Sequence, residues 1–283
     1  MVSPFLCGRY EIDLNESPRI MGIVNVTPDS FSDGGFHATT DTAIEHGLKL
    51  IRDGADIIDI GGESTRPGSD PVSAEDEVAR ILPVIEGLKN AGVPISVDTF
   101  KPEVMKIVLE AGVDMINDIN GLEKPGAIDV VSKFPKAGVC IMHMHGEPKT
   151  MQLNPPDYQG DVVAFLKEYL LRRAKEAESK GIATNRICID PGCGFGKTID
   201  QNYDILSNLD EFKDLGYALL LGISRKMMFG SLLDIPPRDR VVVSVYGAMV
   251  GLDLGANIIR VHDVLETKQA MMIRDKINQH RRK

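Results

Sequence analysis

Polar side chains stand at the ends of nearly all apolar, strand-like runs in this sequence of 283 residues. In chain order they are Asn25, Asp59, Asp98, Asn117, His143 with His145, Asp190, Ser224 with Lys226, and Arg260 with His262. An amide that is buried without a partner costs about 2–7 kcal/mol, and an unpaired charge costs far more. One such residue carries little information, but polar groups at successive strand ends predict a ligand or a polar network.

These polar side chains fall into two chemical groups. The acidic and amide group comprises Asp98, Asn117 and Asp190. It could accept hydrogen bonds from a ring with several N–H donors, such as an amino-pyrimidinone. The cationic group, which suits an anionic phosphate, comprises Arg66, Lys226, Arg260 and His262. Arg260 and His262 are two residues apart on one strand, so both point to the same face. Together the two groups indicate a flat nitrogen heterocycle that carries phosphate.

The stretch DPGCGFGKT, residues 190–198, is one position away from a nucleotide-binding P-loop. A P-loop reads G-x-x-x-x-G-K-[ST], and here Pro191 stands where the first glycine belongs. Because the strand ends already supply ring-binding and phosphate-binding groups, we interpret Asp190 as the functional residue of this stretch. Lys197 then has at most a supporting role, and the glycines allow a tight turn beside the ligand.

Two kinds of metal site can be considered. His143 and His145 would share a strand face as half of a transition-metal site, but no third ligand stands at a matching spacing. Magnesium is favoured if the substrate carries a diphosphate, because the ion binds through phosphates and one or two protein oxygens. Asn25 and Asp33 could supply those oxygens.

Strands and helices alternate along the chain. The strand segments are IMGIVNV (20–26), DGADIIDIGG (53–62), PISVDT (94–99), AGVDMINDIN (111–120), VCIMHMH (139–145), RICIDPG (186–192), ALLLGIS (218–224) and LGANIIRVHD (254–263). Helical periodicity covers 41–53, 73–92, 101–111, 155–181, 201–214, 238–254 and 264–280, with Ser73 and Glu77 opening the second helix and Gly92 closing it. Near-continuous Ile, Val and Leu content fits parallel strands that are covered on both faces. Eight strands that alternate with helical stretches predict an α/β fold of the (β/α)8 TIM-barrel type, with a doubly wound open sheet as the alternative.

The chain is expected to be one domain, residues 1–283. Residues 1–18 would form a short N-terminal extension over the barrel bottom, and residues 19–280 the barrel. The net charge of −9 argues against nucleic acid or an anionic membrane as the main partner. The N-terminus lacks the pattern of a signal peptide, and no run of 18 apolar residues predicts a membrane span. The four cysteines lack zinc-site spacing, and two of them, Cys140 and Cys188, lie in apolar strand-like runs, which suits free buried thiols in a reducing cytoplasm.

Two long segments follow the first two strands, NVTPDSFSDGG (25–35) and GGESTRPGSD (61–70). Both are rich in glycine, hydroxyl groups and charges. Because barrel enzymes place their active sites at the carboxyl ends of the strands, these segments are candidates for mobile covers over a substrate.

Taken together, these segments resemble the motifs of the dihydropteroate synthase family. The matching motifs, in order, are MGIVNVTPDSFSDGG, GGESTRPG, SVDT, INDI, MHM, DPGCGFGK, GISRK and RVHDV. The resemblance implies a transferase of folate biosynthesis that condenses (7,8-dihydropterin-6-yl)methyl diphosphate with 4-aminobenzoate and releases diphosphate. It further implies Mg²⁺ as cofactor, a homodimer that contacts through barrel helices, and inhibition by sulfonamides, which imitate 4-aminobenzoate.

Carried over position by position, the resemblance implies these binding residues. Those for the pterin are Asp98, Asn117, Met142, Asp190, Phe195 and Lys226. Those for the diphosphate are Asn25, Thr65, Arg66, Arg260 and His262, with Mg²⁺ at Asn25 and Asp33. Those for 4-aminobenzoate are Thr65, Pro67, Phe195, Ser224 and Lys226. The residues expected to act in catalysis are Asp98, Asp190, Lys226, Arg260 and His262. Two positions depart from the family pattern: His145 after MHM, and the run 227–229 after SRK.

The reaction expected from these residues is a dissociative substitution in which diphosphate leaves first and the aniline nitrogen then attacks. Three alternatives remain at this stage. A pterin-dependent methyltransferase would use a similar barrel, but it would leave the cationic group without a role. A Schiff-base aldolase could be built on Lys226. A non-catalytic paralogue could keep the fold and bind a pterin only.

Overall fold

Eight parallel strands close into a barrel. The computed structural model describes residues 4–27 and 35–280. The side chains of residues 35–39, at the start of the first long helix, are not described. The barrel strands are β3 (Arg19–Asn25), β4 (Ile57–Gly61), β5 (Ile95–Asp98), β6 (Met115–Asp118), β7 (Gly138–Met142), β8 (Ile187–Asp190), β9 (Ala218–Leu221) and β10 (Ile258–Val261). Each strand pairs with the next in the sequence, and β10 pairs with β3. This last pairing closes the sheet, so the barrel prediction is confirmed and the open-sheet alternative is wrong.

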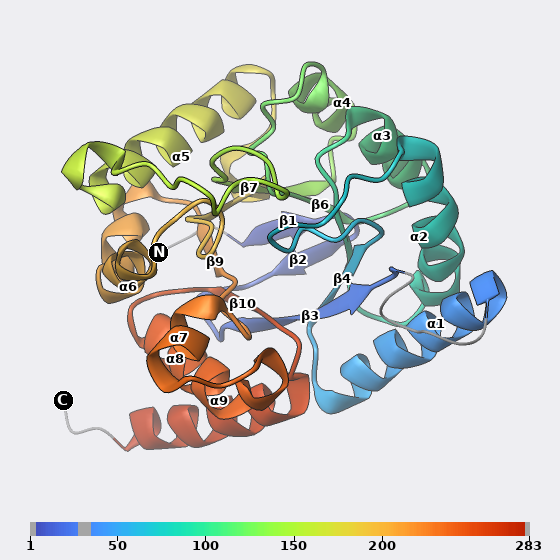
Figure 1. The fold of residues 1–283 in the computed structure, drawn as a ribbon. Coiled ribbons are helices and arrows are strands. Elements are labelled where there is room, and N and C mark those ends of the chain that lie inside the picture. Colours follow the sequence, from blue (N-terminus) through green and yellow to red (C-terminus); the bar gives the residue numbers. More distant parts are fainter. Residues whose placement is uncertain (1–3, 28–34, 281–283) are drawn as a thin grey trace.

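Helices form a ring outside the strands (Figure 1). They are α1 (Gly35–Asp53), α2 (Ala74–Leu88), α3 (Pro102–Glu110), α4 (Ala127–Ser132), α5 (Val162–Ser179), α6 (Ile199–Ser207), α7 (Met227–Leu233), α8 (Val241–Asp253) and α9 (Val264–Gln279). Short 3₁₀ turns lie at Tyr158–Gly160, Thr184–Arg186, Leu209–Leu215 and Pro237–Asp239. The sequence analysis missed α4 and α7, because helices of six and seven residues span too few turns to show a period.

The start of α2 differs in detail from the prediction. The Ser73 hydroxyl accepts from the backbone N–H of Asp76 and caps the helix as expected. Glu77 lies one position too late for a capping box, and its carboxylate contacts Lys101 instead. Gly92 has a positive φ of 87°, but it lies beyond the helix end at Leu88.

Alternation along each strand separates the two faces of the barrel wall. In β4, Ile58 and Ile60 pack outward in the large apolar cluster that includes the buried face of α2. Ile57 points inward and belongs to a second cluster at the bottom of the barrel. Asp59, the next inward residue, is fully buried. The barrel interior is therefore apolar at the amino ends of the strands and polar at their carboxyl ends.

An antiparallel hairpin of β1 (Phe5–Cys7) and β2 (Tyr10–Ile12) precedes the barrel. Phe5, Cys7 and Ile12 share one apolar cluster with inward residues near the amino ends of the strands, such as Met21 and Ile57. The hairpin thus covers the bottom of the barrel, as expected for the N-terminal extension, and leaves the polar end for the site.

Candidate active site

One side of the polar end is a buried network around Arg260. The Nε of Arg260 donates to Oδ2 of Asp59 at 2.6 Å, and its Nη2 donates to Oδ2 of Asp98 at 2.8 Å. The Nδ2 of Asn117, a residue of β6, also donates to Asp59 Oδ2, at 3.0 Å. Oδ1 of Asp59 and Oδ1 of Asp98 are buried without a hydrogen-bond partner among the described residues. Because buried acceptors are normally satisfied, these two oxygens suit N–H donors from a ligand.

Arg260, grouped above with the cations that suit phosphate, lies among acidic side chains. Arg260 reaches across the barrel to strands β4 and β5, where it acts as the counter-ion of two carboxylates. Burial raises the pKa of Asp98 to about 7, although the Arg260 guanidinium opposes the rise. Burial alone would lower the pKa of Arg260, but Asp59 and Asp98 raise it above its ordinary value. Sequence reasoning named Asp59 as a strand end but gave it no role, because its partners lie far along the chain.

His262 lies on the other side of Arg260, next to Ser224. The Ser224 hydroxyl oxygen and Nδ1 of His262 are 3.0 Å apart, and the backbone N–H of His262 donates to the same oxygen at 3.2 Å. Burial and the nearby positive charges of Arg260, Arg225 and Arg66 lower the pKa of His262 to about 3. The imidazole is therefore neutral at pH 7, and it lies in a strongly positive field that suits an anion.

Asp190, Phe195 and Lys226 lie together at the ends of β8 and β9. Oδ1 of Asp190 accepts from the backbone N–H of Gly192 at 2.7 Å, and burial raises the pKa of Asp190 to about 6. The Lys226 ammonium lies 4.1 Å from the centre of the Phe195 ring, a cation–π contact. Burial lowers the pKa of Lys226 to about 8. This arrangement offers one aromatic face, one cation and one carboxylate within a single wall of the site.

Met142 lies in a small apolar cluster with Phe195, and that cluster contains a residue that sequence reasoning missed. Met142, Phe195, Ile119 and Met151 pack together, with Phe100 at the edge. Met151 belongs to the segment between β7 and α5. Only the end of this segment was assigned in the prediction, as the start of the helix 155–181. The side chain of Met151 is buried against Met142 and Phe195, which are both predicted to bind the pterin, so Met151 is a further lining residue.

The segment between β4 and α2 carries Thr65, Arg66 and Pro67. Thr65 is half-buried, whereas Arg66 and Pro67 are exposed. The segment contacts the β7–α5 segment, because the N–H of Gly68 donates to the carbonyl oxygen of Pro148 at 3.1 Å. These residues therefore lie on a tethered loop rather than on a strand, and their position depends on the loop's anchors.

A buried ion cluster anchors the root of this loop. The ammonium of Lys101 bridges the carboxylates of Glu63 and Glu77. Glu77 is 1% exposed and its Oε1 is among the buried atoms without a described partner. Burial raises the pKa of Glu77 above its ordinary value. No local pattern marks the cluster, since its members come from a loop, from α2 and from the start of α3.

The two histidines of the MHM-His segment do not form a shared metal half-site. Nδ1 of His143 lies 3.0 Å from Nζ of Lys197, and His145 is exposed. Among the residues described, no group of three His, Cys, Asp or Glu side chains could hold a metal ion. Lys197 is 2% exposed, so it cannot extend to a phosphate as a P-loop lysine would.

A magnesium ion bound with a diphosphate needs little from the protein. Asn25 is the last residue of β3 and is half-buried. Its Oδ1 lies beside Gly61, 3.8 Å from the position that a Cβ on this glycine would take. A single amide oxygen at the mouth of the barrel fits an ion whose other ligands are phosphate oxygens and water. Asp33, the second expected ligand, lies outside the described residues.

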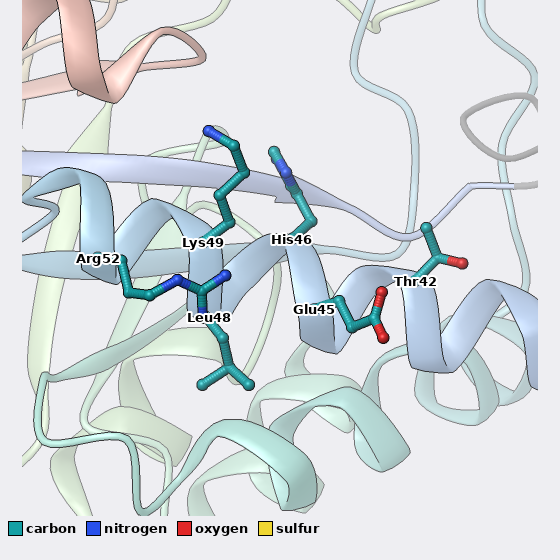
Figure 2. A pocket seen from close by; sticks show the side chains of 6 residues that line it. All are labelled: Thr42, Glu45, His46, Leu48, Lys49 and Arg52. Carbon is teal, nitrogen blue, oxygen red and sulfur yellow. The ribbon is translucent and has the colours of Figure 1, made fainter.

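A separate hollow of about 550 Å³ lies against α1. Figure 2 shows that all six labelled side chains around it, Thr42, Glu45, His46, Leu48, Lys49 and Arg52, come from this one helix. It includes none of the strand-end residues, so it does not belong to the candidate site. Within the described ranges, no helix combines the length and the apolar character needed to cross a membrane.

Comparisons with known proteins agree on one family. Residues 21–262 match the family model described as "Pterin binding enzyme". The chain is 46% identical to the dihydropteroate synthase of Escherichia coli strain K12, over 93% of this chain and 92% of the relative. The Xanthomonas albilineans dihydropteroate synthase with 4-aminobenzoic acid superposes with a TM-score of 0.91, at 44% identity over 98% of both chains. The Burkholderia cenocepacia dihydropteroate synthase complexed with 7,8-dihydropteroate gives a TM-score of 0.89, at 44% identity over 98% of this chain and 97% of that one.

Proposed function

This chain belongs to the pterin-binding enzymes and, within them, to the dihydropteroate synthases, and from that premise we propose how its own residues carry the reaction. The protein is a transferase of folate biosynthesis that condenses (7,8-dihydropterin-6-yl)methyl diphosphate with 4-aminobenzoate to give 7,8-dihydropteroate and diphosphate. The proposal rests on the polar end of the barrel. There the buried carboxylates of Asp59 and Asp98 each have one oxygen without a hydrogen-bond partner among the described residues.

The pterin binds among the acceptors at the carboxyl ends of β5, β6 and β8. Asp98, Asn117 and Asp190 take the N–H groups of the aminopyrimidinone edge, since all three side chains are buried there. Met142 and Phe195 pack on the ring faces, and the apolar cluster that holds them supports this assignment. Lys226 lies beside Phe195 and completes the wall.

The diphosphate binds at the positive end of the same site. His262 and Arg260 supply donors from β10, while Thr65 and Arg66 supply donors from the β4–α2 loop. Burial and the positive charges of Arg260, Arg225 and Arg66 lower the pKa of His262, and these charges support anion binding at this position. Asn25 and, we propose, Asp33 would hold Mg²⁺, which would supply positive charge to offset that of the diphosphate.

4-Aminobenzoate binds next to the pterin, against Thr65, Pro67, Phe195, Ser224 and Lys226. All five of these residues lie on segments outside the strands, so the pocket is completed by loops. Once diphosphate leaves, the carboxylates of Asp98 and Asp190 stabilise the positive charge delocalised over the pterin. The aniline nitrogen is already a usable nucleophile, so its attack needs orientation rather than a strong base. Because the loop residues also hold the diphosphate, we expect 4-aminobenzoate to bind after the pterin diphosphate.

Release of diphosphate is the test of this function. The purified protein is incubated with the pterin diphosphate and Mg²⁺, with and without 4-aminobenzoate, and both diphosphate and dihydropteroate are quantified. We expect diphosphate and dihydropteroate to form in equal amounts, and we expect both to require 4-aminobenzoate. Release without 4-aminobenzoate would indicate hydrolysis, and binding of the pterin without any turnover would indicate a non-catalytic paralogue.

We also propose that the protein is a homodimer that contacts through α7, α8 and α9, which lie next to one another in Figure 1. Large apolar side chains are exposed on these helices: Met227, Leu232, Leu233, Val242, Tyr246, Leu265, Met272, Ile273 and Ile277. The sequence of α8, VVVSVYGAMVGLD, is apolar around its circumference, as expected of a helix buried on more than one side. Light scattering should give a dimer for the wild type and a monomer for Val242→Glu/Tyr246→Glu. Leu153→Glu, at an exposed apolar residue elsewhere, is the control and should remain a dimer.

The four free, buried cysteines support a cytoplasmic location.

A further inference from the structure

The turn after β8 is built from closely packed glycines. Gly192, Gly194 and Gly196 have φ values of 72°, 82° and 69°, a region that L side chains rarely adopt. A Cβ on Gly192 would overlap the carbonyl oxygen of His143, and a Cβ on Gly196 would lie 2.7 Å from Cβ of His145. The turn therefore lies directly against the end of β7, and it carries Phe195 between two of these glycines.

Lys197 is the centre of this turn. Its Nζ lies 2.9 Å from the carbonyl oxygen of Gly192, 3.0 Å from that of Phe195 and 3.0 Å from Nδ1 of His143. The carbonyl oxygen of His143 is a fourth, longer contact at 3.3 Å. Burial lowers the pKa of Lys197 to about 7. In its ammonium form the group has three N–H donors, which match the three shorter contacts. A P-loop lysine directs these donors to phosphate oxygens, whereas Lys197 directs them to its own backbone.

The state of His143 agrees with this arrangement. Nδ1 of His143 can accept from Lys197 only if the imidazole is neutral and carries its proton on Nε2. Burial and the Lys197 charge lower the pKa of His143 to about 2, so the ring is neutral. Its other neighbours are aromatic, with the rings of Tyr158, Phe165 and Tyr169 at centroid distances of 5.7, 5.7 and 4.7 Å.

Other side chains hold the carbonyl groups that Lys197 does not reach. Nε2 of Gln152 donates to the carbonyl oxygen of Gly194, and the hydroxyl of Tyr158 donates to that of Gly196, both at 2.6 Å. Oδ1 of Asn202 accepts from the N–H of Gly194 at 2.6 Å. Hydrogen bonds thus fix the turn at successive residues. Lys197 supplies those to the carbonyl oxygens of Gly192 and Phe195.

We propose that Lys197 is a positioning residue for the two substrate sites. Its ammonium ties the carbonyl oxygens of Gly192 and Phe195 to the end of β7. It thereby fixes the orientation of the Phe195 ring, against which Lys226 lies. The role rests on the proposed function, since Phe195 matters to catalysis only if it separates the pterin from 4-aminobenzoate. Neither substrate touches Lys197, which is enclosed by the protein.

A first experiment tests the structural part without using catalysis. Lys197→Met removes the donors but keeps most of the side-chain volume, and Lys180→Met, at a lysine with 54% side-chain exposure, is the control for charge. Hydrogen–deuterium exchange is measured on peptides that cover residues 186–198. We expect at least about tenfold faster exchange in this turn for Lys197→Met, with α2 and α3 unchanged. Unchanged exchange in the turn would overturn the proposal.

A second experiment separates positioning from general destabilisation. We expect Lys197→Met to lower kcat/KM for 4-aminobenzoate by about tenfold or more, and Lys180→Met to change it by less than about twofold. In a Phe195→Ala background, Lys197→Met should lower kcat/KM by less than about threefold further, because the group it positions is already absent. An equal loss in both backgrounds would show that Lys197 does not act through Phe195 and would refute the proposal.

Two contingencies are covered by the same design. If Lys197→Met yields no folded protein, Lys197→Gln replaces it, since an amide keeps two N–H donors in a shorter side chain. If the wild type shows no turnover with either substrate order, the proposed function fails. The exchange measurement then still decides whether Lys197 fixes the turn.

Discussion

Replacing Lys101 with methionine should destabilise the protein in a strongly pH-dependent way. The change leaves the carboxylates of Glu63 and Glu77 facing each other without the ammonium that now bridges them. Both carboxyl groups are buried, with exposed side-chain fractions of 6% and 1%, so water cannot replace the lost cation. Removal of one partner from a buried ion pair costs about 3–5 kcal/mol.

The protein can limit this cost by protonating one carboxyl group. Holding a glutamic acid of ordinary pKa 4.5 in its neutral form costs about 1.4 kcal/mol for each pH unit above that value. The cost is about 1.4 kcal/mol at about pH 5.5 and about 4.8 kcal/mol at about pH 8. Burial already raises the pKa of Glu77 in the folded wild type, so the folded state binds more protons than the unfolded state. Stability from this group is therefore present at low pH and is lost as the pH rises through the folded pKa.

Urea unfolding at the two pH values measures the effect. We expect Lys101→Met to lose about 3–5 kcal/mol relative to wild type at about pH 8, but only about 1–2 kcal/mol at about pH 5.5. Lys101→Met/Glu77→Gln should recover more than half of the loss at the higher pH. Lys106→Met, which breaks an exposed pair with Glu110, should cost less than about 0.5 kcal/mol. A loss that is equal at both pH values, or below about 1 kcal/mol at about pH 8, would refute the reasoning.

Three further outcomes are expected. Asp98→Asn should lower kcat by at least about 100-fold with the fold intact, as measured by diphosphate release and circular dichroism; near-normal turnover would remove Asp98 from the mechanism. Because burial raises the pKa values of Asp98 and Asp190 to about 7 and about 6, both ionise as the pH rises. The kcat/KM for the pterin diphosphate should therefore increase from about pH 5 to a plateau near pH 8, after correction for ionisation of the substrate; a flat profile would contradict this. Gly192→Ala should cost more than about 3 kcal/mol in urea unfolding, since it combines a left-handed backbone with overlap of His143. Gly181→Ala, with a φ of 90° and no atom within 4 Å, should cost only about 1–2 kcal/mol, and equal losses would argue against the overlap.

The strands and their order could be predicted from the sequence because each carries its own local signal. A run of apolar residues that ends in Asp98 or Asn117 is visible within ten residues, and alternation then fixes which side chains point inward. The same rule places Arg260 inward, between the outward Ile259 and Val261. Short elements such as α4 and α7 escaped because one or two turns contain no period to detect.

The pairing of side chains across the barrel could not be predicted. Nothing local shows that Arg260, expected to bind phosphate, also neutralises Asp59 and Asp98, since these partners are on β4 and β5. Lys197 shows the same limit, because its resemblance to a P-loop lysine is local, whereas its burial comes from packing against His143. The residue identities limit the possible chemistry, and only the closed barrel determines which groups meet.

The contact of Arg260 with Asp59 has a consequence for how the protein is made. The two residues are 201 positions apart in the chain, and Arg260 and Asp98 are 162 apart. A ribosome that adds about 5–20 residues per second produces Arg260 about 10–40 s after Asp59. During that interval the growing chain holds carboxylates destined for the barrel interior and lacks the cation that will accompany them. A chain that stops short of β10 lacks both the strand that closes the barrel and the cation of this network, so it forms neither a closed barrel nor this site.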